Sequence, residues 1–420
     1  MPAGPYSYEL IDSQYDPNTN TLRSVSLSQL NDAGQVLGTL LGGGSRVPSQ
    51  PFLYADGSFT LLAVPGALTT SATQLNNAGE VIGRHTDAAG AHSFLYQDGA
   101  YSEITVPGAD FTTALQISGG GQILADYFDS AGLHPVIDDN GSFTTLAVPG
   151  AASTSVRANA LSSSNSLPAI NDADQVIGSY TDDTGSHAFL YDGSGNYTTL
   201  AVPNGFNTTA TEINSAGQVL GTYTLAPGSS NPGNTRPFLY SDGTYTTIAP
   251  PGATSVTNAQ LNDAGQVAGT YNDAAGTHAF LDTNGTYAVI NPSSTSATST
   301  STFLTQLTNA GDVLASGSSS GPFVYSGGTS TDASVPGAPS TNLSRINDAG
   351  QLIGSFYDGV TTHYFLATPT GTGGAQAADT TGAVTPAADG GTGADVLSMV
   401  DGTAASMPDF GTTNPNVVLA

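Results

Sequence analysis

Short runs of alternating apolar and polar residues, separated by turns, recur along most of the chain. The clearest copy spans Thr254–Ile290 and holds four such runs, at 259–261, 266–271, 278–281 and 287–290. Each turn between them contains glycine, and Asn284-Gly285 is a strong signal for a two-residue hairpin. Because no helical period is present, the pattern predicts four short β-strands in each copy.

The first turn of this unit recurs eight times, at a mean spacing of about 45 residues, which is typical of four-stranded propeller blades. The eight turns begin at Asn31, Asn76, Ser118, Asn171, Asn214, Asn262, Thr308 and Asn347. The last copy stops after its third strand, at His363–Ala367, whereas Tyr8–Asp12 aligns with the missing fourth strand. We therefore predict an all-β fold, an eight-bladed β-propeller of four-stranded blades closed by the N-terminal strand. The degenerate turn Ser118–Gly121 leaves seven blades as the alternative.

The chain divides by composition into a propeller, residues 1–370, and a tail, residues 371–420. The tail is rich in Gly, Ala, Thr and Asp, so we expect it to be flexible and disordered. Its segment Gly390–Ser398 matches the calcium nonapeptide G-G-x-G-x-D-x-U-x once, with Asp395 as the candidate metal ligand. A calcium roll needs stacked copies, so we expect calcium to bind weakly at most and expect no other cofactor.

The third strand carries the triplets His187-Ala188-Phe189 and His278-Ala279-Phe280, varied at residues 92–94 and 363–365. In these residues the chain resembles the HAF-repeat family of extracellular bacterial proteins, over roughly residues 6–369, counting the repeats alone. The resemblance implies secretion and a repeat fold, and it supplies no catalytic residues.

The route of export is predicted from the two ends of the sequence. Residues 1–10 have neither the basic region nor the apolar core of a secretory signal. The tail, with its single nonapeptide and the apolar finish Asn416–Ala420, resembles the tails of repeats-in-toxin proteins. That resemblance implies type I secretion with an uncleaved C-terminal signal, and hence an extracellular protein.

The charge balance is strongly acidic, with 33 Asp and Glu, six Arg, no Lys and a net charge of −27. Such a surface repels nucleic acid and anionic lipid. No apolar run approaches membrane-spanning length, so we expect no membrane insertion. The absence of Cys excludes disulfides, thiolate metal sites and a Cys nucleophile.

Loop length varies mainly at two connections, between strands two and three and between strand four and the next strand one. In an up-and-down blade these connections share one face, and variable loops on a rigid scaffold often carry function. Aromatic rings beside polar groups suit carbohydrate, although they could instead fill gaps between blades. The candidate ligand-binding residues at these connections are Tyr15, Arg46, Phe111, Arg157, Phe206, Arg236 and Phe303.

Five copies share an Asp followed five residues later by a His. We interpret the pair as a turn brace, in which Asp caps backbone N–H groups of its own turn and His begins the next strand. The alternative is a ring of metal sites or acid–base dyads, but a catalytic site is built once, so we assign no catalytic residue. The pairs are Asp87 and His92, Asp129 and His134, Asp182 and His187, Asp273 and His278, and Asp358 and His363.

These features predict a secreted bacterial propeller that acts as a non-enzymatic binding or surface/matrix protein, with extracellular polysaccharide or a cell surface as its partner. One alternative is a propeller enzyme that acts on polysaccharide, a glycosidase or lyase. The other is a purely structural matrix component. The sequence gives no indication of the oligomeric state.

Overall fold

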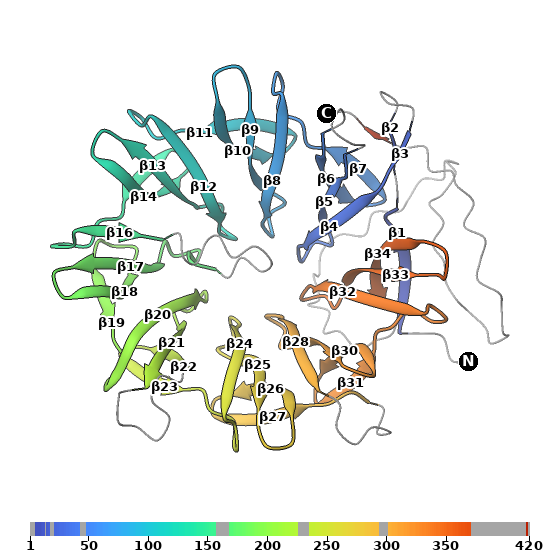
Figure 1. Ribbon diagram of the computed structural model, residues 1–420. Coiled ribbons are helices and arrows are strands. Elements are labelled where there is room, and N and C mark those ends of the chain that lie inside the picture. Colours follow the sequence, from blue (N-terminus) through green and yellow to red (C-terminus); the bar gives the residue numbers. More distant parts are fainter. Residues whose placement is uncertain are drawn as a thin grey trace, which may run out of the picture. The chain divides into compact units, whose positions relative to one another are not determined.

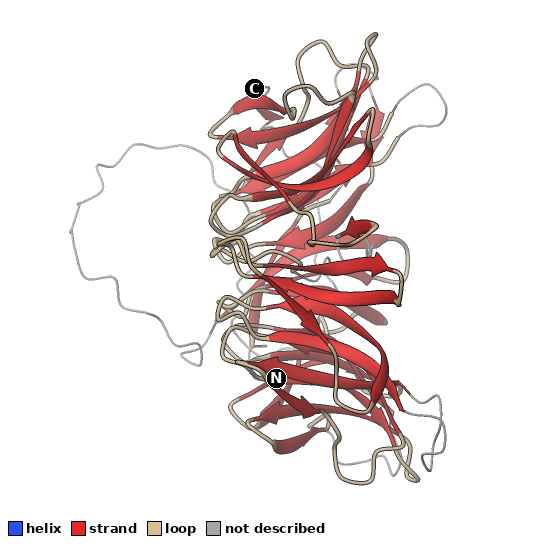
Figure 2. Ribbon diagram, turned by 90° about the vertical axis from the view of Figure 1, so that its left-hand side faces the viewer, coloured by secondary structure: helices blue, strands red, loops and turns tan. Residues whose placement is uncertain are grey.

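The computed structural model describes residues 5–12, 14–16, 21–42, 48–156, 168–225, 235–293, 301–370 and 417–418. The chain forms two compact units, Leu62–Asp332 and the combination of Met1–Leu61 with Ala333–Ala420. Strands joined by loops make up both units (Figure 2), and the described residues contain no helix.

The unit Leu62–Asp332 contains six antiparallel four-stranded sheets, each formed by four consecutive strands (Figure 1). In chain order, blade 2 is β8 (Thr69–Leu75), β9 (Val81–Thr86), β10 (Ala91–Gln97) and β11 (Ala100–Ile104), and blade 3 is β12 (Phe111–Ile117), β13 (Ile123–Asp129), β14 (Gly132–Asp139) and β15 (Ser142–Thr145). Blade 4 is β16 (Ser153–Ser155), β17 (Val176–Asp182), β18 (Gly185–Tyr191) and β19 (Tyr197–Leu200), and blade 5 is β20 (Gly205–Ile213), β21 (Val219–Leu225), β22 (Thr235–Ser241) and β23 (Thr244–Thr247). Blade 6 is β24 (Ser255–Leu261), β25 (Val267–Asn272), β26 (Thr277–Thr283) and β27 (Thr286–Ile290), and blade 7 is β28 (Thr302–Leu307), β29 (Val313–Gly317), β30 (Gly321–Ser326) and β31 (Thr329–Asp332).

The other unit contains blades 1 and 8. Blade 1 is β4 (Val25–Leu30), β5 (Val36–Leu40), β6 (Gln50–Ala55) and β7 (Ser58–Leu61), and β35 (Val417–Val418) pairs in parallel with β7. Blade 8 is β32 (Ser340–Ile346), β33 (Leu352–Tyr357), β34 (Thr362–Pro369) and the N-terminal strand β1 (Tyr6–Leu10). In a separate two-stranded sheet, β2 (Gln14–Asp16) pairs antiparallel with β3 (Thr21–Arg23).

The fold is therefore an eight-bladed β-propeller, and the predicted closure by the N-terminal strand is confirmed. Blade 3, whose turn is degenerate in sequence, has all four strands. The alternative of seven blades is thus wrong.

The centre of most blades is a phenylalanine on the third strand packed over a glycine on the second. In blade 6, Gly269 lies opposite Phe280, and a Cβ added to Gly269 would lie 2.7 Å from the ring. Phe280 is completely buried. Blade 3 has Ala125 opposite Val136, so a larger second-strand residue accompanies a smaller third-strand residue at the same site. Blade 7, by contrast, places Ala315 opposite Phe323, so an alanine on the second strand can also face a phenylalanine.

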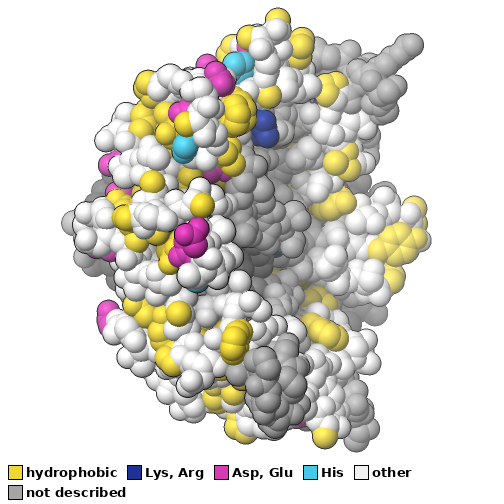
Figure 3. Space-filling model, turned by 60° about the vertical axis from the view of Figure 1, so that its left-hand side comes forward, with side chains coloured by type: hydrophobic (Ala, Val, Ile, Leu, Met, Phe, Trp, Pro, Cys, Tyr) yellow, Lys and Arg dark blue, Asp and Glu magenta, His cyan; other side chains and the backbone are white. Residues whose placement is uncertain are grey.

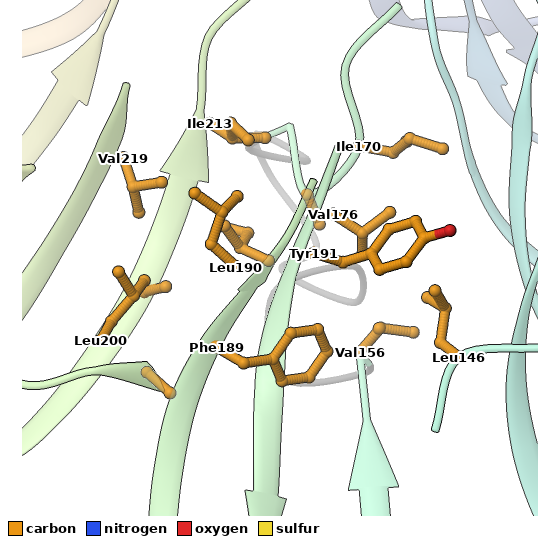
Figure 4. Close-up of a cluster of buried hydrophobic side chains, with 14 of the residues drawn as sticks. Leu146, Val156, Ile170, Val176, Phe189, Leu190, Tyr191, Leu200, Ile213 and Val219 are labelled. Carbon is orange, nitrogen blue, oxygen red and sulfur yellow. The ribbon is translucent and has the colours of Figure 1, made fainter. Parts of the chain in front are cut away.

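Both faces of a blade are buried, as the apolar residues at both parities require. Figure 4 shows this for β18, where Phe189 and Tyr191 lie on the side of Leu146 from blade 3. Leu190, between them in sequence, lies on the side of Val219 from blade 5. The core of this unit is thus formed between neighbouring sheets, as expected for stacked repeats.

The first strands are longer than the sequence pattern indicates. In blade 6 the alternation begins near Ala259, but β24 begins at Ser255, with a register shift between Thr257 and Gln260. The shift breaks the period of two, since a bulge inserts one extra residue. In blade 4 the first strand, β16, is short, and Ile170 forms an isolated antiparallel bridge with Val176.

Candidate functional site

The turn between the first and second strands is held by its leading asparagine. In blade 5, Asn214 Oδ1 accepts hydrogen bonds from the N–H groups of Ala216 (3.1 Å) and Gln218 (2.9 Å). Its Nδ2 donates to Gln218 Oε1 and, 3.0 Å away, to the carbonyl oxygen of Asn262 in blade 6. One buried side chain therefore caps its own turn and links it to the next blade.

The same link recurs from blade to blade. The other donor side chains and acceptor carbonyl oxygens in the unit Leu62–Asp332 are Asn76 and Ser118 (3.0 Å), Asn171 and Asn214 (2.9 Å), and Asn262 and Thr308 (3.0 Å). Buried polar groups need such partners, so the repeated asparagine has a structural reason.

A cavity of about 270 Å³ opens at these turns, and all the residues that line it belong to Leu62–Asp332. Its buried part includes Asn76, Asn171 and Asn214, together with Gln116. The second residue of each turn is exposed and forms the rim, which consists of Asn77, Gly119, Asp172, Ser215, Asp263 and Asn309. The lining is therefore mostly polar. Its buried part carries side-chain amides, and its rim carries the carboxylates of Asp172 and Asp263.

Glutamine side chains from the bulged first strands support the cavity. Gln116 Oε1 accepts a hydrogen bond from Ala169 N–H at 2.7 Å, and Gln260 Oε1 accepts one from Leu307 N–H at 2.8 Å. Glu212 occupies the same position in blade 5 and accepts from Leu261 N–H at 2.8 Å. Burial raises the pKa of Glu212 to about 8, although the Leu261 hydrogen bond opposes this rise.

The cavity lies at the opposite end of the blades from the predicted ligand-binding aromatics. Three of these aromatics lie at the beginning of first strands rather than in the connections where we placed them. They are Phe111, Phe206 and Phe303. They are 46%, 51% and 44% exposed, so they do not fill gaps between blades. On the face shown in Figure 3, exposed hydrophobic side chains form small patches among polar ones.

Phe111 has two apolar neighbours across the sheet. Its ring stacks on that of Phe128, with centroids 5.3 Å apart and an interplanar angle of 6°. Phe128 lies opposite Leu133 on the next strand. We call Phe111, Phe128 and Leu133 the blade-3 apolar strip, and all three are exposed.

Arg236, also predicted to bind ligand from a loop, lies in β22 opposite Tyr223. In blade 4 the corresponding pair is His187 opposite Tyr180, with ring centroids 5.1 Å apart. Arg236 thus takes the strand position that holds histidine in five other blades. Sequence spacing concealed this, because a long insertion precedes Arg236.

The five Asp–His pairs are in contact. The Asp Oδ to His Nε2 distance is 3.1–3.2 Å for four pairs and 3.4 Å for Asp87 and His92. Asp182 Oδ1 also accepts from Thr184 N–H at 2.7 Å and Gly185 N–H at 3.2 Å. The Thr184 hydroxyl and backbone hydrogen bonds lower the pKa of Asp182 to about 2. These contacts are those of a capped turn.

His363 has a second carboxylate partner that joins it to the N-terminal strand. Its Nδ1 lies 2.7 Å from Asp12 Oδ2 and its Nε2 lies 3.2 Å from Asp358 Oδ2. Asp12 also accepts from Tyr364 N–H at 2.9 Å. Asp12 therefore fastens the end of β1 to β34.

Several predicted residues lie outside the described part of the chain. Arg46, Arg157 and Asp395 are among them. Tyr15 lies in β2, but its side chain is not described. The part of the chain that is described contains no helix suited to crossing a membrane.

No family model and no curated protein matches the sequence. Among solved structures, the chain is similar to the β-propeller domain of the Trilobed protease from Pyrococcus furiosus (TM-score 0.43, 10% identity, 79% of this chain and 100% of that chain). It is also similar to the acylaminoacyl peptidase of Pyrococcus horikoshii (0.43, 11%, covering 82% and 59%) and to virginiamycin B lyase from Staphylococcus aureus (0.34, 12%, covering 73% and 97%). At these identities the likeness concerns the fold and carries nothing about activity.

Proposed function

We propose that this propeller is a secreted, non-enzymatic protein that binds extracellular polysaccharide at the end of the blades where strands two and three connect. The observation that supports this is the blade-3 apolar strip. Phe111 and Phe128 present a stacked aromatic pair that is 46% and 38% exposed, next to Leu133, which is 43% exposed. Apolar side chains grouped at a surface mark binding sites more often than scattered ones do.

Blades 4 and 6 carry polar residues at the positions of the strip. Blade 4 has Ser153, Thr181 and Ser186 there. Blade 6 has Ser255, Asn272 and Thr277. The three apolar side chains of blade 3 are therefore not needed to build a blade, which supports a role in binding.

Phe206 and Phe303 supply further exposed rings on β20 and β28. A polysaccharide repeats one unit many times, so it can contact several weak sites at once. Linked contacts of this kind raise the overall affinity without any single strong contact. Aromatic rings suit the apolar faces of sugar rings and lose little conformational entropy when they bind.

The test mixes the full-length protein with a panel of insoluble polysaccharides and measures both protein depletion and new reducing or unsaturated ends. We expect saturable depletion without new ends. New ends would replace the binding function with the glycosidase or lyase alternative. No depletion on any polysaccharide would favour the structural matrix alternative.

Variants connect the binding to the blade-3 apolar strip. Phe111→Ser with Phe128→Thr introduces the residues of blade 4, and we expect an affinity loss of about tenfold or more. Leu68→Thr is the control, because Leu68 is 72% exposed and lies in the connection that leads to β8. Equal affinity for the double variant and the wild type would refute the site.

Export through the tail is a separate part of the proposal. Deleting residues 371–420 should leave the protein inside the producing cell while the propeller still folds. Normal export of the truncated chain would contradict type I secretion and would leave the polysaccharide test unaffected.

A further inference from the structure

The cavity at the first turns is separate from the blade-3 apolar strip, which lies at the other end of the blades. We propose that this cavity is a binding site for a small organic cation, an alkylammonium or polyamine. The proposal rests on the balance of donors and acceptors around the cavity and does not depend on polysaccharide binding.

Three buried amide donors of the cavity are already used. Asn76, Asn171 and Asn214 each donate Nδ2 to a carbonyl oxygen of the following blade. The same amides donate to the side chain four residues further on, which is Glu80, Gln175 or Gln218. A ligand that enters the cavity therefore finds few free donors from these side chains.

The rim, in contrast, offers carboxylate acceptors. Asp172 Oδ1 accepts from Gly120 N–H at 2.8 Å, and Asp263 Oδ1 accepts from Ser215 N–H at 2.8 Å. Within the described residues, the second oxygen of each carboxylate makes no hydrogen bond. Each Asp is thus held in place by one oxygen, and both residues line the cavity.

The described residues of the lining carry charge of one sign only. Asp172 and Asp263 are the ionisable side chains among the described residues that line the cavity. A ligand that matches this lining must donate hydrogen bonds and carry positive charge. An alkylammonium group meets both requirements, since –NH₃⁺ has three donors and no acceptor.

The size of the cavity favours an organic molecule. About 270 Å³ is far more than one bare ion occupies and lies near the lower end of the range for small-molecule sites.

Titration calorimetry with putrescine and spermidine, at about 150 mM salt to screen diffuse attraction, tests the site directly. 1,4-Butanediol is the matched neutral ligand, because it replaces both amines of putrescine by hydroxyl groups. We expect saturable binding of the amines with one ligand per chain, and no heat from the diol. Equal affinity for the diol, or the absence of saturable amine binding, would overturn the proposal.

The key variant is Asp172→Asn with Asp263→Asn. The fold should tolerate it, because Asn309 occupies the same turn position and accepts from Asp263 N–H at 3.0 Å. We expect at least about a tenfold loss in spermidine affinity, as for other charge-assisted contacts. Thermal unfolding of each variant verifies that the fold is retained.

The control variant removes two charges elsewhere. Asp98→Asn with Asp242→Asn changes exposed hairpin residues at φ 50° and 47°, where Asn140 and Asn284 occupy the corresponding positions at 49° and 53°. A protein of net charge −27 attracts any polyamine, and both double variants alter that charge equally. We expect the control to bind within about twofold of the wild type. An equal loss in both double variants would mean diffuse attraction alone and would refute the site.

Discussion

Asn347 donates its side-chain amide to the carbonyl oxygen of Asn31, 2.9 Å away, although 316 residues separate them in the chain. The contact repeats the link between Asn214 and Asn262 with the last and first turns of the repeat array. Closure of blade 8 onto blade 1 therefore uses the same hydrogen bond as the joints between consecutive blades.

Replacing Asn347 by Ala should lower the free energy of unfolding by about 1–3 kcal/mol, because buried hydrogen-bond partners lose their donor and acceptor. Urea unfolding measures the change. Asn342→Ala is the control, since Asn342 is exposed on the adjacent strand. Equal stabilities for Asn347→Ala and Asn342→Ala would show that the link contributes nothing.

Glu212→Gln should stabilise the protein above pH 5. Burial raises the Glu212 pKa from 4.5 to about 8, so the folded state keeps a proton that the unfolded state loses between those values. Stability therefore falls as the pH rises from about 4.5 to about 8. Glutamine keeps an acceptor for Leu261 N–H and does not ionise, and the gain at pH 8 should be up to about 4 kcal/mol. Gln260→Glu is the mirror variant and should introduce the same pH dependence into blade 6.

His363 should make closure of blade 8 sensitive to pH. Burial lowers the pKa of His363, but the hydrogen bonds to Asp12 and Asp358 raise it more, so the net pKa lies above 6.5. The stabilisation is complete below pH 6.5 and is lost as the pH rises through the folded pKa. Since Glu212 titrates in the same range, the comparison uses Glu212→Gln as the parent and adds His363→Gln. A pH profile that is unchanged by His363→Gln would contradict this assignment.

Gly269 and Phe280 should be energetically coupled. Gly269→Ala alone overpacks the site, at a cost of about 1–3 kcal/mol, and Phe280→Val alone leaves a cavity with a cost of similar size. The double variant recreates the Ala125 and Val136 pair of blade 3. Its loss of unfolding free energy should be smaller than the sum of the single losses by at least about 0.5 kcal/mol. Additive losses in a double-mutant cycle would show that the two sites adjust independently.

The blade and its count were predictable because the signals are local. Hairpin signals such as Asn284-Gly285 mark the turns, and the split last repeat indicates closure by the N-terminal strand. The start of each first strand was not predictable. In β24, for example, the register shift near Gln260 breaks the alternation, and the half of the strand that precedes this shift is rich in Ser and Thr. For that reason Phe111, Phe206 and Phe303 looked like loop residues.

The cavity was not predictable from one repeat. Its lining comes from equivalent turns of six blades, and each contributes side chains that look like ordinary turn residues. Asp172 and Asp263 become a pair only when the strands bring them to one rim. The asparagine link was hidden for a similar reason, because its acceptor is a backbone oxygen and leaves no mark in the sequence.

The pairing of β1 with β34 has a consequence for synthesis. Ser7 contacts Thr368, a residue that the ribosome adds 361 positions later. At translation rates of about 5–20 residues per second, β1 waits roughly 20–70 s for its partner strand. Blades 2 to 7 can form their sheets as they emerge, but blade 8 can form only at the end. An unpaired β1 is therefore exposed to chaperones, or to the β34 edge of another nascent chain, for most of the time that the protein takes to be made.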